Sequence, residues 1–595
     1  AGGCLEGDRD VVGDGSRRLE DPAHHLSTRT PVILLLPVLA VALLLRLWGL
    51  AQGYPDFYGH VDEIGVAASI WNFFRSGTLQ PTEFTYPALY QYLVAAGIWA
   101  TAVSGMLDLP DGGGLVAGIA FVSYVDPGWS ALVGRSLSAI AATGVVAVLY
   151  RLGRDIEGRS LGLTAAAFGT VAVIPLRHAH QALPDSLASL LGAGVLWAAW
   201  HVAMRGQWRD YIASGVCTGL LLATKYNGAL CALAVVAAHG WRCGARRTLF
   251  GVRLWAAGIL ALVVCLMVSP YLLLAYEQYL GVARYQVSSL GFTLRQTSPW
   301  WWIARGLVAE ELIVGGWMLA GVVLAMARRR AIGVISLAAI LPAVLYIGSW
   351  TRESLHYLLP YYPFLLILAA GACLALCRRI AARPYMTLAV VCLSLVPSMW
   401  RGAGDAGMQK LPDTRALAAD WIKSNVPDGS TLGMTWLPYC PHVDLAQTRR
   451  GILQHYESQP AWQNRLRQSW AHTPSYRIVN LEAWLSRPVV PEALRSQVDL
   501  DDPETRRVFS RGWRSRERLK TDGVEFLVLP AAVYERYLAD GEPPSAPAAR
   551  FRYLLNQSYF QGLLNDSRSE KLVSLPHAGQ PARGSQIDIY RLLGP

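Results

Sequence analysis

Charged side chains are scarce in this sequence. They make up 16% of its 595 residues, whereas an average soluble protein contains roughly 25%. Hydrophobic residues reach 53%, and the mean hydropathy is +0.28. This composition excludes a soluble enzyme, a disordered protein and a coiled coil. It indicates a polytopic membrane protein, because only a bilayer lets so much apolar side chain face outward.

Acidic residues are fewer than basic ones, with 42 Asp and Glu against 53 Lys and Arg and a net charge of +11. In a soluble protein this excess would suggest nucleic acid as a partner. Here the arginines cluster in short joints between apolar runs, which is typical of the cytoplasmic loops of membrane proteins. We therefore expect contact with membrane lipids and no nucleic-acid partner.

Cysteine spacing indicates neither a disulfide framework nor a zinc site. Most of the 9 cysteines lie in or beside apolar segments, and Cys440 is the only one after residue 400. A disulfide framework in the C-terminal region is therefore excluded, and no zinc-ligand spacing occurs. The chain also lacks internal repeats and sustained low-complexity tracts.

The arginine clusters predict a topology for residues 31–400. We expect residues 1–30 to form a cytoplasmic tail, because arginines precede the first apolar run. The expected spans are 31–50, 131–152, 161–178, 185–204, 210–225, 226–241, 254–273, 305–327, 331–350, 357–377 and 384–400. This count of about eleven is odd, so the C-terminus is expected outside the cell.

Residues 53–130 are expected to form a large first outer loop. Two amphipathic pieces within it, Glu63–Arg75 and Tyr86–Met106, are predicted as interfacial helices. If the second piece crossed the membrane, the arginine-rich joint after residue 150 would lie outside. That arrangement breaks the positive-inside rule.

From residue 401 to 595 the composition becomes polar, and no apolar run long enough to span a bilayer remains. A helix is predicted over Asp413–Ser424, and strands over Thr431–Met434, Val524–Leu529 and Ile587–Leu592. Arg449–Arg518 shows no clear organisation. The predicted fold class is an all-α polytopic membrane domain followed by an extracytoplasmic α/β domain.

Two adjacent carboxylates, Asp62 and Glu63, follow the first predicted span. A carboxylate in a partly dry pocket can act as a general base when its pKa approaches the working pH. Asp62 also precedes a predicted helix, so an N-capping role is an equal alternative. The sequence leaves both roles open.

Two further ionisable residues lie at predicted span ends. Asp185, in Leu183-Pro184-Asp185, is either an interfacial N-cap or part of a site. Lys225 divides a long apolar stretch, where a cation suits a phosphate at headgroup depth. Its alternative is a lysine whose stem lies in the bilayer and whose charge reaches water.

The predicted topology brings many other polar residues to the same outer face. Such residues need a partner or water at a span end, so their convergence from separate loops suggests a site. A metal pair formed by His178 and His180 is a minor alternative. The set comprises His60, Arg177, His178, His180, Arg295, Arg352, Glu353 and His356.

These residues fall within short motifs that resemble the glycosyltransferase C superfamily. The similarity is to the branch that includes protein O-mannosyltransferases and the lipid A aminoarabinose transferase. It covers about residues 31–400. The motifs are Asp62-Glu63, Tyr86-Pro87-Ala88-Leu89-Tyr90, Arg135-Ser136-Leu137-Ser138-Ala139, Leu183-Pro184-Asp185, Thr224-Lys225-Tyr226 and His356-Tyr357-Leu358-Leu359-Pro360.

The resemblance implies an inverting transferase that takes a sugar from a polyprenyl phosphate to a hydroxyl-bearing acceptor, at the outer face of the inner or plasma membrane. It implies that Asp62 is the catalytic base, that Glu63 orients it, and that Asp185 positions a substrate. It also implies a phosphate site, formed by Lys225, Arg352, His356 and Tyr357. No cofactor is expected, although relatives in the superfamily leave room for a divalent cation.

Two other classes of function stay open from the sequence. A transporter or lipid flippase would place charges near the membrane midplane and often contains repeats, whereas here the charges lie at one face. A nonenzymatic assembly protein would use its C-terminal domain to bind a partner, with the carboxylates acting only as helix caps.

Overall fold

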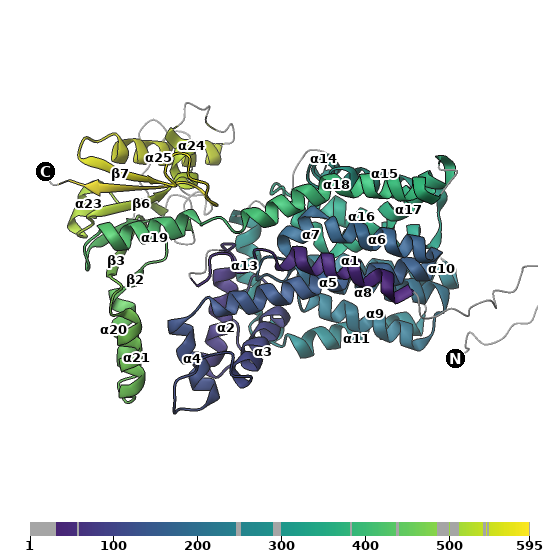
Figure 1. Cartoon of the computed structure of the whole chain (residues 1–595), viewed down its shortest axis with the longest axis horizontal. Helices are drawn as coiled ribbons and strands as arrows, with labels where there is room; N and C mark the ends of the chain where they lie inside the picture. Colours follow the sequence, from purple (N-terminus) through teal and green to yellow (C-terminus); the bar gives the residue numbers. More distant parts are fainter. Residues whose placement is uncertain are drawn as a thin grey trace, which may run out of the picture.

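Two parts make up the protein, a bundle of long helices and a smaller part built on a sheet (Figure 1). The computed structural model describes residues 31–55, 59–244, 251–289, 299–380, 384–435, 439–484, 499, 511–538, 543 and 547–593. The predicted tail, 1–30, and Arg295 lie outside these residues. The predicted fold class, a helical membrane domain followed by an α/β domain, is confirmed.

The bundle contains apolar helices at the positions of the predicted spans. Among the described residues, five helical segments are long and apolar enough to cross a membrane: Trp129–Glu157 (α5), Asp185–Met204 (α8), Ala331–Gly348 (α16), Leu355–Ile380 (η3 and α17) and Tyr385–Met408 (most of α18). Shorter apolar helices include α1 (Pro31–Leu47), α11 (Val252–Val268) and α15 (Ile313–Arg328). The protein is therefore an integral membrane protein, while the predicted number of eleven spans stays a prediction.

Several predicted spans are broken into two pieces. The span predicted at 161–178 is divided into α6 (Arg159–Val171) and α7 (Val173–His178). The span at 226–241 consists of η1 (Tyr226–Cys231) followed by α10 (Ala232–Cys243). The span at 305–327 is divided between α14 (Pro299–Glu311) and α15. A hydropathy average over a span-length window does not show these breaks, because apolar residues continue on both sides of each one.

A proline and a buried carboxylate account for the break between α6 and α7. Pro175, the third residue of α7, lacks an N–H and clashes with the preceding turn, so α6 cannot continue through it. Glu311 accepts hydrogen bonds from the backbone N–H groups of Val173, at 2.6 Å, and Ile174, at 2.9 Å. These N–H groups begin α7 and so lack helical acceptors. Glu311 also ends α14, and the next residue, Leu312, has a positive φ of 56°. The same position thus interrupts two predicted spans.

The first predicted outer loop contains three helices. The two expected ones are present as α2 (Glu63–Ser76) and α3 (Leu89–Val103). The sequence analysis missed the third, α4 (Leu115–Val125). It has 11 residues, which is too short for a span, and it follows a run of glycines that obscured the helical pattern. The Arg75 side chain joins α2 to α4 by donating a 2.7 Å hydrogen bond to the Ser123 hydroxyl.

The C-terminal part is built on a six-stranded sheet with the order β2-β3-β1-β6-β8-β7. The strands β1 to β3 and β6 are parallel, whereas β8 is antiparallel to both β6 and β7. All three predicted strands and the predicted helix are found. The strands are β1 (Thr431–Met434), β2 (Asp444–Leu445), β3 (Ser475–Asn480), β6 (Phe526–Pro530), β7 (Ser569–Leu575) and β8 (Ile587–Leu592), and the helices include α19 (Thr414–Asn425), α23 (Arg516–Thr521), α24 (Ala531–Leu538) and α25 (Pro547–Leu564).

The unassigned stretch Arg449–Arg518 contains a helical arm. It consists of α20 (Ala446–His455) and α21 (Pro460–Trp470), which extend away from the sheet toward α4 (Figure 1). The arm packs on α4 through a small apolar cluster that includes Phe121 and Trp462. The Trp462 indole donates a 2.8 Å hydrogen bond to the carbonyl of Asp111. The C-terminal part therefore rests on the first loop. The short strands β4 (Glu482–Trp484) and β5 (Arg511–Trp513) form a separate pair.

Candidate functional site

The predicted site residues lie where several helices of the bundle begin. Asp185 is the first residue of α8, His356 lies in η3 (Leu355–Tyr361), and Lys225 immediately precedes η1. Asp62 precedes α2. We call this end of the bundle the site end.

Glu63 is a buried anchor of the site end. Its carboxylate forms a two-point ion pair with Arg135 of α5, at 2.7 and 3.0 Å. It also accepts hydrogen bonds from the backbone N–H groups of Ala182, at 2.6 Å, and His60, at 3.1 Å. These four bonds tie the loop before α2 to α5 and to the loop before α8. A charge this deeply buried needs such partners.

Asp62 has a different environment, although it is the next residue. Its side chain is 51% exposed, and an ionisable neighbour, His60, lies nearby, with 3.7 Å between His60 Nδ1 and Asp62 Oδ2. Asp62 occupies the N-cap position of α2, but its side chain accepts no capping hydrogen bond. The carboxylate is therefore held in place by its buried neighbour Glu63 while its own oxygens face solvent.

Lys225 and Asp185 form a buried ion pair. The Lys225 ammonium lies 2.6 Å from Asp185 Oδ1, and the two side chains are 7% and 1% exposed. The same ammonium lies over the rings of Tyr86, at 5.5 Å, and Tyr357, at 5.7 Å. An aromatic face attracts a cation. Lys225 is thus a largely buried cation that contacts one carboxylate and lies near two aromatic rings.

Two tyrosine hydroxyls lie within electrostatic range of both Asp62 and this ion pair. Both Tyr86 and Tyr357 interact electrostatically with Asp62 and with Asp185. Burial raises the pKa of Tyr86 well above its usual value. Its hydroxyl therefore keeps its proton and can donate a hydrogen bond to an anion. The exposed carboxylate and the buried pair belong to one electrostatic cluster.

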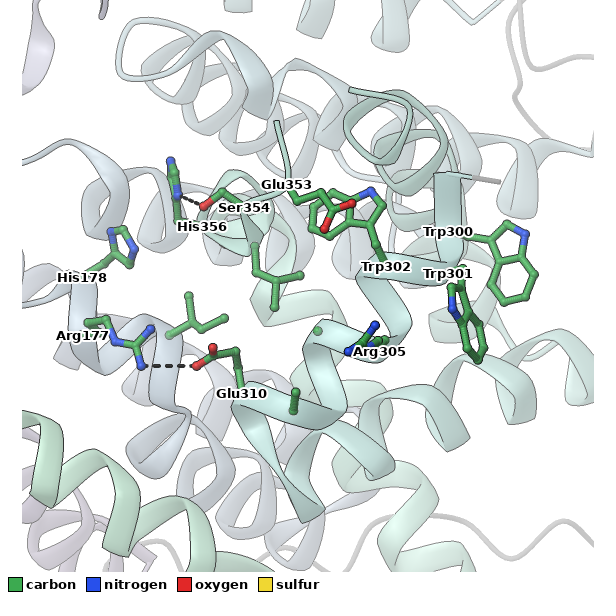
Figure 2. Close-up of a pocket in the computed structure, with 14 residues that line it drawn as sticks. Arg177, His178, Trp300, Trp301, Trp302, Arg305, Glu310, Glu353, Ser354 and His356 are labelled. Atoms are coloured by element: carbon green, nitrogen blue, oxygen red, sulfur yellow. Dashed lines mark hydrogen bonds and ion pairs between the residues drawn. The ribbon is translucent and has the colours of Figure 1, made fainter. Parts of the chain in front are cut away.

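A cavity of about 840 Å³ opens beside this cluster. The rings of His178 and His356 stack with their centres 5.2 Å apart, and both line the cavity. Figure 2 shows these histidines on one side and Trp300 and Trp301 on the other. Both histidines interact electrostatically with Asp185 and Lys225. The two histidines therefore bring one wall of the cavity within electrostatic range of the ion pair, although neither Asp185 nor Lys225 lines the cavity.

The remaining predicted residues take different positions. Arg352 is exposed in the bend before η3, where its charge acts on the Tyr357 hydroxyl. Arg177 pairs with Asp405 at 2.8 Å and with Glu310 at 3.2 Å, and both Arg177 and Glu310 line the cavity. Glu353 also lines the cavity.

His180 points away from the cluster. Its ring nitrogens lie 2.9 and 3.0 Å from the carbonyls of Leu176 and Trp48, which indicates a packing role. Among the described residues, no group of three or more His, Cys, Asp or Glu side chains is arranged to hold a metal ion. The expectation about cofactors stays a prediction.

Sequence reasoning missed part of the site. Tyr86 and Arg135 lie in motifs noted for their family resemblance, but their contacts with Lys225 and Glu63 depend on chain packing. A tyrosine after a turn, or an arginine in an apolar helix, does not by itself indicate a residue of a functional site. The role of Glu311 was missed for the same reason. The sequence around an acidic residue at the edge of an apolar run does not indicate which helix its carboxylate will cap.

Comparison with known proteins gives one match to a family profile. Residues 117–273 match the family described as Dolichyl-phosphate-mannose-protein mannosyltransferase. No curated protein matches the chain significantly.

Solved structures with a similar course of the chain include two of ArnT from Cupriavidus metallidurans. Its apo form is 14% identical, with a TM-score of 0.48 over 95% of this chain and 99% of that chain. The form bound to undecaprenyl phosphate is 13% identical, with the same score and coverage. The Archaeoglobus fulgidus oligosaccharyltransferase with Zn and sulfate is 12% identical, with a TM-score of 0.46 over 88% of this chain and 71% of that chain. The resemblance predicted from the sequence is confirmed through the profile match, which supports a membrane glycosyltransferase.

Proposed function

We propose that the protein is an inverting glycosyltransferase that moves a sugar from a polyprenyl-phosphate donor to a hydroxyl of a protein, lipid or glycan acceptor. One observation carries the proposal. An exposed carboxylate, Asp62, shares an electrostatic cluster with a buried cation, Lys225, and with two tyrosine hydroxyls. A base beside a phosphate-binding cation is what this reaction requires.

In the proposed reaction, Asp62 accepts the proton of the acceptor hydroxyl. The hydroxyl oxygen forms a bond to the anomeric carbon on the face opposite the lipid phosphate. The bond between that carbon and the phosphate oxygen breaks, and its electron pair leaves with the phosphate. The sugar is transferred with inversion, and polyprenyl phosphate is released.

Lys225 stabilises the charge that grows on the leaving phosphate. An ammonium group has three N–H donors, and the contact with Asp185 uses one of them. The others are available to phosphate oxygens, as is the Tyr86 hydroxyl. Asp185 holds the lysine at this depth. Arg352, in the bend before η3, and His356, in η3, belong to the same proposed phosphate site.

Glu63 acts as a positioning residue in this scheme. All its bonds go to Arg135 and to two backbone N–H groups. It therefore fixes the loop that presents Asp62 and takes no proton itself. The reaction as written uses no cofactor, and an assay with and without a chelator tests whether a divalent cation contributes.

We further propose that the site end and the C-terminal domain face the extracytoplasmic side of the inner or plasma membrane. The arginine-rich joints, including 328–330, lie at the opposite ends of the helices. Such clusters are typical of cytoplasmic loops.

The direct test supplies purified protein with a panel of radiolabelled polyprenyl-phosphate sugars and a mixture of hydroxyl-bearing acceptors. We expect free polyprenyl phosphate and labelled acceptor from the wild type and neither from Asp62→Asn. A transporter or flippase would instead move labelled lipid across a vesicle membrane without cleaving it. Movement without cleavage would overturn the proposal.

A further inference from the structure

A second cavity lies at the other end of the bundle. It has a volume of about 220 Å³ and is bordered by the ends of α5, α15 and α17 and the beginning of α16. The helices α5, α8 and η3–α17 all start at the site end, so this cavity lies near the opposite membrane surface. We call it the basic-end cavity.

Most of the wall of the basic-end cavity is apolar. Leu161, Leu324, Ile332, Ile367 and Leu368 line it together with Trp200. Apolar walls between transmembrane helices suit an acyl chain better than water. Gly371 of α17 also lines the cavity, and a Cβ atom added there would meet nothing within 4 Å. The helix surface at Gly371 therefore faces open space.

The rim of the cavity is basic. Arg328, Arg330 and Arg378 line it together with one acidic residue, Glu157. Arg330 and Arg378 both reach the same carboxylate oxygen of Glu157, at 3.5 and 3.0 Å. One carboxylate cannot neutralise three guanidinium groups, so the rim keeps a net positive charge.

An anionic ligand can readily displace Glu157 from the ion pairs on this rim. The side chains of Arg330 and Arg378 are 65% and 56% exposed, and exposed ion pairs contribute little stability. A phosphate can take two parallel hydrogen bonds from each guanidinium and carries a full charge. Basic pockets between transmembrane helices are known to hold anionic headgroups.

We propose that the basic-end cavity binds one anionic phospholipid, with its phosphate at Arg330 and Arg378 and part of an acyl chain against the apolar wall. The positive charge of the rim favours an anionic headgroup over a zwitterionic one. The cavity provides a defined binding site for one lipid, in contrast to nonspecific attraction of lipids to a basic surface. This proposal does not depend on the transferase activity.

The test measures the thermal midpoint of the full-length protein in detergent, with phosphatidylglycerol or with phosphatidylcholine of the same acyl chains. A ligand that binds only the folded state raises the midpoint, and we expect an increase of about 2–4 °C with phosphatidylglycerol alone. Native mass spectrometry should show one phosphatidylglycerol retained per protein.

Three variants separate a site from general charge attraction. Arg330→Gln with Arg378→Gln should abolish the increase. Gly371→Leu should abolish it as well, because the leucine fills the cavity while every charge stays. Arg379→Gln removes the same charge from a neighbour that does not line the cavity, so the increase should persist.

The other outcomes overturn the proposal. An equal increase with phosphatidylcholine would show that the headgroup charge plays no part. An increase that persists in Gly371→Leu, or that disappears in Arg379→Gln, would show that lipid acts on the whole basic surface instead of the cavity.

Discussion

The guanidinium of Arg415 donates a 3.0 Å hydrogen bond to the carbonyl oxygen of Gly59. Arg415 belongs to α19 of the C-terminal domain, whereas Gly59 lies in the loop that leads to Asp62. From the other side, Gly59 is packed so tightly that an added Cβ atom would lie 1.8 Å from a Glu63 carboxylate oxygen and 2.1 Å from Arg135 Nη2. The loop that leads to Asp62 is thus held between the membrane domain and the C-terminal domain.

Asp413 organises this contact. Its carboxylate accepts hydrogen bonds from Arg415 at 2.8 and 3.0 Å and from Arg583 at 3.0 Å. Arg583 in turn reaches the side-chain oxygen of Gln52, in the turns that follow α1. Two arginines that share one buried carboxylate therefore connect the C-terminal domain to both sides of the loop.

We expect Arg415→Ala to lower kcat while leaving KM for the lipid donor nearly unchanged. A small displacement of a catalytic group can slow a reaction by roughly 10²-fold, and we expect about 10- to 100-fold here. Arg477→Ala is the control, because Arg477 is exposed on β3, away from the loop. Equal kcat values for Arg415→Ala and Arg477→Ala in steady-state assays would refute the positioning role of Arg415.

Asp62→Asn should be the most damaging single change in the site. Loss of a general base slows a reaction by roughly 10²–10⁴-fold. Because the Asp62 side chain makes no capping bond, the thermal midpoint should not change. Single-turnover assays together with thermal unfolding check both parts. Normal turnover in a well-folded Asp62→Asn protein would exclude the proposed base.

Lys225→Met should affect both stability and catalysis. It leaves Asp185 buried without its partner, which typically costs about 3–5 kcal/mol. Lys225→Met combined with Asp185→Leu removes both charges and should recover most of the stability. We expect both the single and the double variant to be inactive, since both lack the cation proposed to stabilise the leaving phosphate. Restored turnover in the double variant would show that the pair only supports the fold.

Arg352→Met should act on the donor without affecting the fold, because Arg352 is exposed. We expect KM for the lipid donor to rise by roughly 10-fold, the effect of losing about 1.4 kcal/mol of binding. Donor titrations at a fixed acceptor concentration measure it. If Arg352 and Lys225 contact one phosphate, combining their variants should give less than the sum of the two effects.

The sequence predicted those features that follow from local pattern. Apolar runs located the helices of the bundle, and an amphipathic pattern located α19. The structure adds that the Asp413 side chain caps this helix by accepting from the Arg415 N–H. The sequence could not predict the interruption of two spans at Glu311, because the carboxylate caps α7 from a distant segment. The family resemblance gave Asp62 and Glu63 different roles, but the local pattern could not show which of the two side chains is buried. The two residues are adjacent and chemically alike, and only the position of Arg135 decides which one is buried.

Cys440 should resist alkylation in the folded protein. Burial raises the pKa of its thiol to about 12, whereas an unperturbed thiol ionises near 8.5. At pH 8 the folded protein should therefore keep Cys440 protonated and unreactive, and denaturant should expose it. Since the unfolded thiol loses its proton more readily, raising the pH above roughly 8.5 should also favour unfolding of this domain. Peptide mapping after alkylation, with and without denaturant, measures how much of Cys440 has reacted under each condition.

The proposed orientation predicts which surfaces an impermeant thiol reagent reaches in intact cells. Ser76, at the end of α2, and Ser424, in α19, are both exposed, and a cysteine at either position should react from outside. A cysteine at Arg209, near the start of α9 (Trp208–Leu222), is also exposed but lies at the arginine-rich end, so it should react only after the cells are opened. The three variants are made in a background whose exposed native Cys392 is replaced by serine. Labelling of Arg209→Cys in intact cells, together with protection of Ser76→Cys and Ser424→Cys, would invert the orientation and place the transfer reaction on the cytoplasmic side.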